Sequence, residues 1–194
     1  MYQKYHTEAL VLGSSEQGEH DRIFTLYTKD FGLLRARASA VRTEASRMRY
    51  ALQNYSRTYV TLVRGKRGWR IGGSLAMKGA LGSTENISAF ARIVRLITRL
   101  VAGEEQNVYL FATLSSAHDV LMSFREQVSE GSSAIVELVC VARILYALGY
   151  LSSEALQTAL FTHTAYTGEY LLEAEMLRDQ LLSHVNRAIA ETHL

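Results

Sequence analysis

Ten residues in the first half of the chain form a group that could bind a polyanion. Arg35 and Arg37 stand two apart in an alternating run, so both would project from one face of a strand. Guanidinium groups pair bidentately with phosphate oxygens, and an exposed aromatic face can stack on an unpaired base. A single arginine is usually a solvated surface residue, so the prediction depends on the grouping. The predicted contact residues are Arg35, Arg37, Arg42, Arg47, Arg49, Arg64, Lys66, Arg67, Trp69 and Arg70.

The aromatic residues of this region have a second possible role. Tyr50 and Tyr55 follow the basic connector, and Trp69 lies between Arg67 and Arg70. Large aromatic side chains mostly pack in cores, so we rank core packing slightly ahead of base stacking for these residues.

The charge distribution supports a division of labour between the two halves. Residues 1–80 hold 14 Lys/Arg against 6 Asp/Glu, whereas residues 81–194 hold 7 against 13. The formal net charge of +2 therefore combines a basic half with an acidic half. A polyanion bound by the first half, with the second half as a scaffold or protein-docking surface, is the expected arrangement.

Signals for catalysis or metal binding are poor, and we predict no enzyme, no metal and no cofactor. Gly65–Gly68 is too short for a phosphate-binding loop, and Gly72–Ser74 does not follow the dinucleotide fingerprint. His118 and Asp119 are adjacent on a predicted helix and so face different directions. The single Cys140, within an apolar run, excludes an internal disulfide. With no apolar span of about 18 residues and no signal sequence, a cytoplasmic location is expected.

The elements that must position the basic residues change type near residue 80. Alternating patterns predict five short strands within residues 7–12, 22–28, 33–41, 57–63 and from 69 onward. Five strands in fewer than 80 residues favour a small closed barrel over an open sheet with exposed edges. A basic connector, residues 42–54, separates the third strand from the fourth.

The second half shows helical periodicity. Apolar residues from Ile87 to Val101 recur at spacings of three and four, with Thr84 as the predicted N-cap. Further helices are expected from Val108 to Phe124, over 133–148 ending at Gly149, over about 153–160, and along Leu177 to Ile189. The predicted architecture is therefore an α+β protein of two domains, residues 1–80 and residues 81–194, the second a helical bundle.

Several segments resemble a known family, the bacterial recombination mediator RecO. The similarity is dense over residues 7–65 and looser afterwards, and the Gly-Glu-x-Asp-Arg-Ile stretch is its most specific part. The segments that carry it are Glu8–Gly13, Gly18–Thr28, Gly32–Ala36, Ala40–Arg42, Ser46–Arg49, Leu52–Gln53 and Glu137–Tyr150.

The resemblance implies an N-terminal OB-fold that binds nucleic acid, followed by a RecO-like α-helical domain. It implies binding and annealing of DNA strands, single-stranded and duplex, and help in loading RecA onto strands coated by single-strand-binding protein (SSB). The expected partners are RecR, the acidic C-terminal tail of SSB and, indirectly, RecA, with no membrane contact. The location implied is cytoplasmic and nucleoid-associated during repair.

The chain departs from the family at one point. Many members carry a four-cysteine zinc module after the Leu-Gly-Tyr segment, but no cysteine follows Tyr150 here, so a member without the module is predicted. A docking site for an acidic SSB tail would need local cations in an apolar groove. The candidates for this partner contact are Arg92, Arg95, Arg99 and Arg143.

Two other functions remain open. A barrel-plus-bundle adaptor would recognise proteins and bind nucleic acid only nonspecifically, with affinity that collapses near physiological salt. An RNA-binding OB-fold protein would instead contact the 2′-hydroxyl and favour RNA over DNA of the same sequence.

Overall fold

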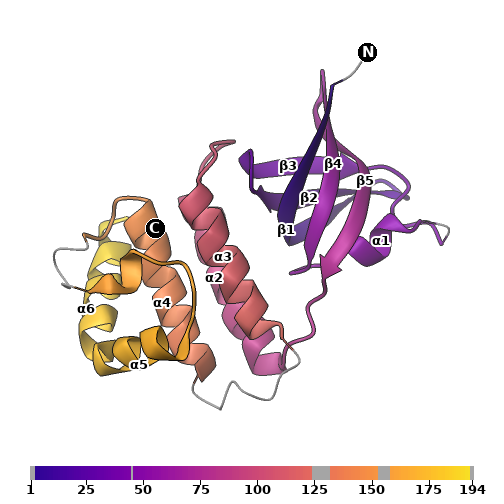
Figure 1. Ribbon diagram of the computed structural model, residues 1–194. Helices are drawn as coiled ribbons and strands as arrows, with labels where there is room; N and C mark the ends of the chain where they lie inside the picture. Colours follow the sequence, from indigo (N-terminus) through magenta and orange to yellow (C-terminus); the bar gives the residue numbers. More distant parts are fainter. Residues whose placement is uncertain (1–2, 45, 124–131, 153–157, 193–194) are drawn as a thin grey trace. The chain divides into compact units, whose positions relative to one another are not determined.

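The computed structural model describes residues 3–44, 46–123, 132–152 and 158–192 (Figure 1). The chain divides into two compact units, each with its own core. Residues 1–80 together with 101–111 form the first unit, and residues 81–100 together with 112–194 form the second. The sequence-based boundary at residue 80 does not anticipate that 101–111 join the barrel unit.

The first unit is a closed five-stranded barrel, as the alternating sequence pattern predicts (Figure 1). Its strands are β1 (Lys4–Gln17), β2 (Asp21–Thr28), β3 (Gly32–Ala38), β4 (Arg57–Gly65) and β5 (Gly68–Lys78). They close in the order β1-β2-β3-β5-β4, and β3 runs parallel to β5 while the other neighbours are antiparallel. Closure leaves no open sheet edge. This part of the fold is an OB-fold-like barrel.

The barrel core follows from strand alternation. In β3, Leu34, Ala36 and Ala38 are buried while Arg35 and Arg37 are exposed. Each strand thereby contributes apolar side chains to the interior and polar ones to the surface. The buried cluster consists of Ala9, Val11, Phe24, Leu26, Leu34, Ala36, Ala38, Val41, Leu52, Val60, Leu62, Trp69 and Ile71.

Two strand ends differ from the sequence-based expectation. Strand β1 does not end near Gly13, because a bulge between Val11 and Gly13 shifts the register and lets pairing with β2 continue to Gln17. Strand β3 ends at Ala38 rather than Val41. Ala40 has φ of 54° and turns the chain, and its N–H donates to Asp21 Oδ1 at 2.8 Å.

The connector between β3 and β4 contains one short helix, α1 (Met48–Ala51). Ala51 and Leu52 are buried, and Met48 packs against the barrel core. Helix α1 also contacts β5. The connector therefore helps to close the barrel interior, while its charged side chains remain toward solvent.

Residues 101–111 pack on the barrel at the turn between β2 and β3. Gly32 has φ of 62°, and a Cβ there would overlap the Glu105 carbonyl group, whose carbon would lie 2.8 Å away. Phe111 stacks on Tyr27 with 6.4 Å between the ring centroids. Only glycine fits Gly32's position, because it must accept both a left-handed backbone and a close neighbour.

The second unit is built around helix α4 (Ser132–Ala147), which contacts α2 (Thr84–Leu100), η2 (Ala159–Phe161), α5 (Gly168–Met176) and α6 (Arg178–Glu191). Helix α4 is apolar nearly all round and is largely buried, as predicted. The turn that follows it contains Gly149, whose φ is 80°. The N–H of Tyr150 donates to the Leu145 carbonyl at 2.9 Å, which completes a glycine C-cap.

The N-cap of α2 differs from the expectation. The side chain of Ser83, not Thr84, caps α2, because Ser83 Oγ accepts from Asn86 N at 3.2 Å. The expected helix along Leu177 to Ile189 is confirmed as α6 (Arg178–Glu191), whereas α5 (Gly168–Met176), which precedes it across Leu177, was not predicted.

Two other predicted helices fall on segments that are only partly described. Helix α3 spans Val108–Leu121 and is shorter than predicted, because Met122 and Ser123 are not helical; Phe124 lies outside the described residues. The same is true of residues 153–157 of the predicted short helix; of that helix the structure shows only η2. Among the described residues, no helix has the length and apolar character needed to cross a membrane.

Candidate nucleic-acid interface

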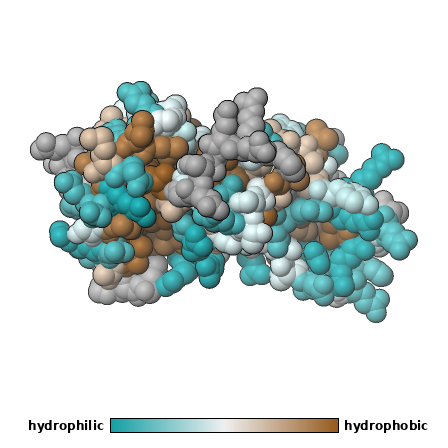
Figure 2. Space-filling model, turned by 90° about the horizontal axis from the view of Figure 1, so that it is seen from below, coloured by the Kyte–Doolittle hydropathy of each residue, from teal (hydrophilic) through white to brown (hydrophobic). Residues whose placement is uncertain are grey.

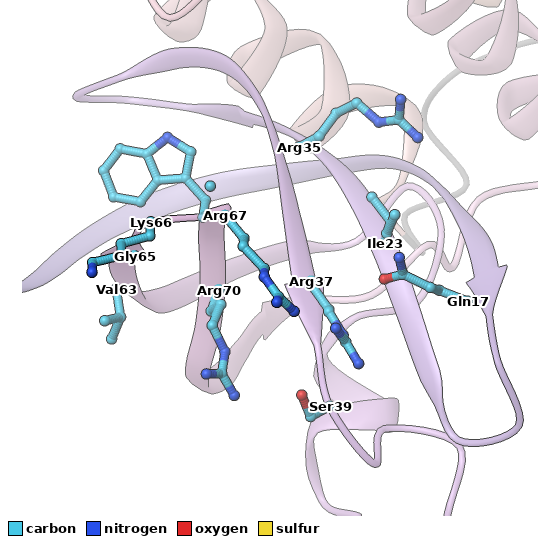
Figure 3. A pocket seen from close by; sticks show the side chains of 12 residues that line it. Gln17, Ile23, Arg35, Arg37, Ser39, Val63, Gly65, Lys66, Arg67 and Arg70 are labelled. Carbon is cyan, nitrogen blue, oxygen red and sulfur yellow. The ribbon is translucent and has the colours of Figure 1, made fainter.

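A hollow of about 760 Å³ lies on the outer surface of the barrel where β3 meets β5 (Figure 3). The parallel pairing puts Arg37 directly opposite Arg70. In Figure 3 the guanidinium groups of Arg37, Arg67 and Arg70 lie on one side of the hollow, whereas the Arg35 side chain extends away from them. The hollow is lined by Gln17, Ile23, Arg35, Arg37, Ser39, Val63, Gly65, Lys66, Arg67, Gly68, Trp69 and Arg70.

Four of these cations have no carboxylate partner within the described ranges of the chain: Arg35, Lys66, Arg67 and Arg70. Two of them, Lys66 and Arg67, occupy the turn between β4 and β5, where Gly68 has φ of 100°. All four side chains are exposed. Their positive charge is therefore available to an external anion, and bidentate guanidinium geometry suits phosphate.

Arg37 differs from these four because it is held by Asp21. Its Nε donates to Asp21 Oδ2 at 2.8 Å, and a second guanidinium nitrogen contacts the same oxygen. The other carboxylate oxygen accepts from Ala40 N. The hydrogen bond from Ala40 and the one from Arg37 lower the pKa of Asp21 below its usual 3.8. Asp21 thus ties β2, β3 and the following turn together.

Two further predicted contact residues also have acidic partners. Arg64 pairs with Glu104 at 3.3 Å and lies over the Trp69 ring, 5.1 Å from its centroid. Arg42 pairs with Glu16 at 3.3 Å and donates to the Gly18 carbonyl at 3.3 Å. These arginines belong to the basic surface, but their charge is already partly balanced.

Trp69 belongs to the barrel core, the role favoured slightly over base stacking from its sequence, so its place among the predicted DNA contacts is corrected. Only 5% of its surface is exposed, and its ring packs on Tyr5 and Phe31 with centroid separations of 5.5 and 5.2 Å. It points inward because it pairs with the buried Ala36 on β3. A base cannot stack on this indole, so Trp69 lines the floor of the hollow and supports it.

The connector carries a separate group of basic residues that do not line the hollow. Arg47 is exposed, and Arg49 donates to the hydroxyl of Tyr50 at 2.6 Å. The Tyr50 side chain is 63% exposed. Tyr55, in contrast, is half-buried and has φ of 64°, and its N–H donates to the Val11 carbonyl at 2.7 Å.

The cations predicted for partner contact in the helical unit have different environments. Arg143 is fully buried, and its guanidinium donates to the Leu160 and Ala165 carbonyls at 2.7 and 3.0 Å. It therefore fixes the segment after α4, and the prediction of a partner contact is corrected. Arg92 makes a bidentate pair with Glu137. Arg95 and Arg99 are exposed on α2.

Sequence reasoning missed Asp21, although it lies in the most specific part of the family-like motif. An acidic residue within a basic region is a signal that could have pointed to Asp21. Its partner Arg37, however, is 16 residues away in the sequence. Ser39 and Gln17 also line the hollow and were not predicted. In the part of the chain that the structure describes, no group of three or more His, Cys, Asp or Glu residues could hold a metal ion.

Figure 2 shows one face of the barrel unit covered largely by hydrophilic side chains. Together with the exposed cations of the hollow, this surface suits a hydrated, charged ligand better than an apolar one.

Comparison with known proteins agrees with this geometry. The sequence model described as "Recombination protein O N terminal" matches residues 1–70, which hold four of the five strands and the turn that carries Lys66 and Arg67. A DNA repair protein RecO from Myxococcus xanthus is 34% identical over 118 residues, covering 59% of this chain and 48% of that protein. One from Dehalococcoides mccartyi is 31% identical over 120 residues, covering 60% and 47%.

A third relative matches a shorter region more closely. A DNA repair protein RecO from Desulfitobacterium hafniense is 40% identical over 62 residues, covering 32% of this chain and 23% of that protein. The chain thus spans less than half the length of these curated relatives. By the matching family model and these relatives, the chain is similar to proteins of the RecO family.

Proposed function

We propose that this protein acts in DNA repair and homologous recombination by binding single-stranded DNA on the barrel and annealing complementary strands. The observation that carries the proposal is the hollow between β3 and β5, with four exposed cations that no described carboxylate neutralises. A polyanion with regularly spaced phosphates is the ligand that such a cluster attracts. Help in loading RecA onto SSB-coated strands is part of the same proposal.

The hollow favours recognition of the backbone rather than of base sequence. Its only aromatic lining residue, Trp69, is buried, so phosphate contacts dominate there. Such contacts position a strand without reading its sequence, and they apply to duplex DNA as well. Strands held by their phosphates keep base edges accessible for pairing. Annealing needs this property, and it needs no catalytic group.

The proposed partners are RecR and the acidic C-terminal tail of SSB, with RecA affected indirectly. Of the four cations considered for the SSB tail, Arg95 and Arg99 are exposed and have no acidic partner among the described residues. Arg92 is occupied by Glu137, and Arg143 is inside the unit. Any electrostatic contact with an acidic tail on α2 would therefore use Arg95 and Arg99.

A protein adaptor is a second candidate function, and exposed apolar residues of the helical unit favour it. Leu172 and Met176 lie one turn apart on α5, and the Met176 side chain is 88% exposed. Apolar side chains exposed in this way are typical of protein-docking surfaces when they form a patch. This candidate predicts no acceleration of strand pairing.

Strand annealing at about 0.15 M salt separates these functions, because exposed charges are screened beyond roughly 8 Å there. Two complementary DNA strands are precoated with SSB or with SSB lacking its acidic tail, and naked DNA and RNA strands serve as parallel substrates. We expect acceleration that depends on the SSB tail. Acceleration of naked strands alone would remove the SSB contact, preference for RNA would favour the RNA-binding alternative, and no acceleration would favour the adaptor.

A further inference from the structure

The outer face of β4 and β5 carries exposed apolar side chains beyond the hollow. Tyr59 and Leu75 are register partners on these strands, and their side chains are 44% and 69% exposed. Neither residue belongs to the barrel core. Tyr59 and Leu75 thus place an exposed ring and an exposed aliphatic side chain next to each other on this sheet face.

This face continues directly from the cations of the hollow along β5. Arg70 pairs with Val63, Gly73 with Thr61 and Leu75 with Tyr59. A strand rises roughly 3.3 Å per residue, so Leu75 lies about 17 Å from Arg70. That distance corresponds to a few nucleotides of an extended strand, within the site sizes of roughly 4–16 nucleotides that OB-folds use.

Two glycines leave the surface between Arg70 and Leu75 flat. A Cβ on Gly72 would come no closer than 3.7 Å to any neighbour, and one on Gly73 no closer than 3.9 Å. Larger side chains would therefore fit, and packing does not require glycine at either position. Because neither glycine carries a side chain, a planar group can approach the backbone closely at these two positions.

The combination of charge and shape selects one kind of ligand. The exposed cations at the start of β5 attract an anionic backbone, and the tyrosine at the far end offers a ring face. A strand of unpaired nucleotides has both features, since it joins phosphates to flat bases. A duplex hides its base faces and could use only the cations.

We propose that Tyr59, with Leu75 beside it and the open backbone of Gly72 and Gly73, forms a base-stacking platform for single-stranded nucleic acid whose phosphates lie at Arg67 and Arg70. This inference rests on the proposed function and deepens it. It gives the barrel a means to prefer single strands over duplex, which the hollow alone does not provide.

The test compares Tyr59→Ala with Tyr59→Phe, using an oligo-dT strand and an abasic strand of the same length and charge. Stacking on an aromatic side chain accounts for about 1–3 kcal/mol per base, so Tyr59→Ala should weaken oligo-dT binding roughly 5- to 150-fold. The abasic strand and a duplex should bind as before. Tyr59→Phe should retain affinity, because the ring remains.

A second variant tests the platform without removing the tyrosine. Gly73→Val adds a side chain suited to a strand but covers the flat surface, so it should also weaken oligo-dT binding more than abasic binding. Thermal unfolding of each variant confirms that the barrel is folded. Unchanged oligo-dT affinity in both folded variants, or equal loss on oligo-dT and abasic strands, would overturn the platform.

A variant of the hollow separates this failure from failure of the proposed function. Arg67→Ala/Arg70→Ala should weaken binding to every DNA probe, including the abasic strand. If that loss occurs while Tyr59→Ala binds normally, the hollow remains the DNA site and the platform is wrong. If the wild-type protein binds none of the probes, both proposals are wrong.

Discussion

At the scale of single residues, Asp21 determines how Arg37 and the turn after β3 are held. It accepts hydrogen bonds from the Arg37 side chain and from Ala40 N, whereas Arg67 and Arg70 on the same surface have no described acidic partner. A phosphate approaching Arg37 must compete with a carboxylate already in place. The role of Arg37 is therefore mainly positioning, and the unpaired cations make the larger contribution to binding.

The Asp21 contacts predict a specific acid dependence of stability. In the folded protein the pKa of Asp21 is below 3.8. The ionised carboxylate therefore contributes fully to folding stability above pH 3.8, and that contribution is lost as the pH falls through the lower pKa of the folded state. Asp21→Asn should reduce stability at neutral pH and flatten the stability profile at about pH 4 and below. Chemical unfolding across that range measures the effect.

The matched control is Asp30→Asn, which changes an exposed acidic residue in the turn before β3. It should leave the acid limb of the profile as in the wild type. If both variants give the same profile, Asp21 does not couple the turn to pH.

Binding of DNA at neutral pH should fall less in Arg37→Ala than in Arg67→Ala.

Residue types alone could not give these roles. The alternation of β3 correctly predicts that Arg35 and Arg37 share the exposed face. The Asp21 pair depends on the register of the β2–β3 hairpin, in which Arg22 lies opposite Ala38, and composition does not determine that register. Arg143 was misassigned because its charge favoured the surface, although its place in an apolar helix already indicated burial.

At the scale of elements, the barrel was predictable because its strands alternate clearly. Closure and the five strands follow from that pattern, but the strand order and the extent of β1 do not, since a bulge after Val11 keeps pairing beyond Gly13. Trp69 illustrates the same limit. Strand alternation puts Trp69 and Ile71 on one face of β5 and Arg70 on the other. It does not say which face is buried; that follows from the pairing of Trp69 with the buried Ala36 on β3.

The contact of 101–111 with the β2–β3 turn gives a second prediction. Gly32→Ala should destabilise the protein, because the new Cβ meets the Glu105 backbone and the left-handed backbone disfavours alanine. Strain of the backbone alone costs roughly 1–3 kcal/mol. Urea unfolding should therefore show that Gly32→Ala lowers the free energy of unfolding more than a substitution that introduces backbone strain alone.

Gly18→Ala is that control. Gly18 has φ of 67° but a Cβ there would meet nothing within 4 Å. The difference between the two variants isolates the contact with Glu105. Equal losses of unfolding free energy would mean that residues 101–111 can move away from the barrel without penalty.

At the scale of the whole molecule, the two units have opposite charge balance and different surfaces. The basic half forms the barrel with its hollow, and the acidic half forms the helical unit with exposed apolar residues on α5. The change in sequence periodicity near residue 80 predicts this change of architecture. It could not predict that 101–111 join the barrel, because that depends on contacts far apart in sequence.

The central claim is that unpaired cations of the hollow bind phosphates of single-stranded DNA. Equilibrium binding of a labelled oligo-dT across a series of salt concentrations tests it most directly. The comparison is between wild type, Arg67→Ala/Arg70→Ala and the ion-paired control Arg42→Ala/Arg64→Ala, which removes the same formal charge.

Each phosphate contact on a single strand contributes about 0.7 to the slope of log affinity against log salt. The account predicts that Arg67→Ala/Arg70→Ala weakens binding and reduces the slope by about 1.4, whereas the control pair changes both quantities much less. Equal effects of the two double variants, or a slope that neither changes, would contradict it.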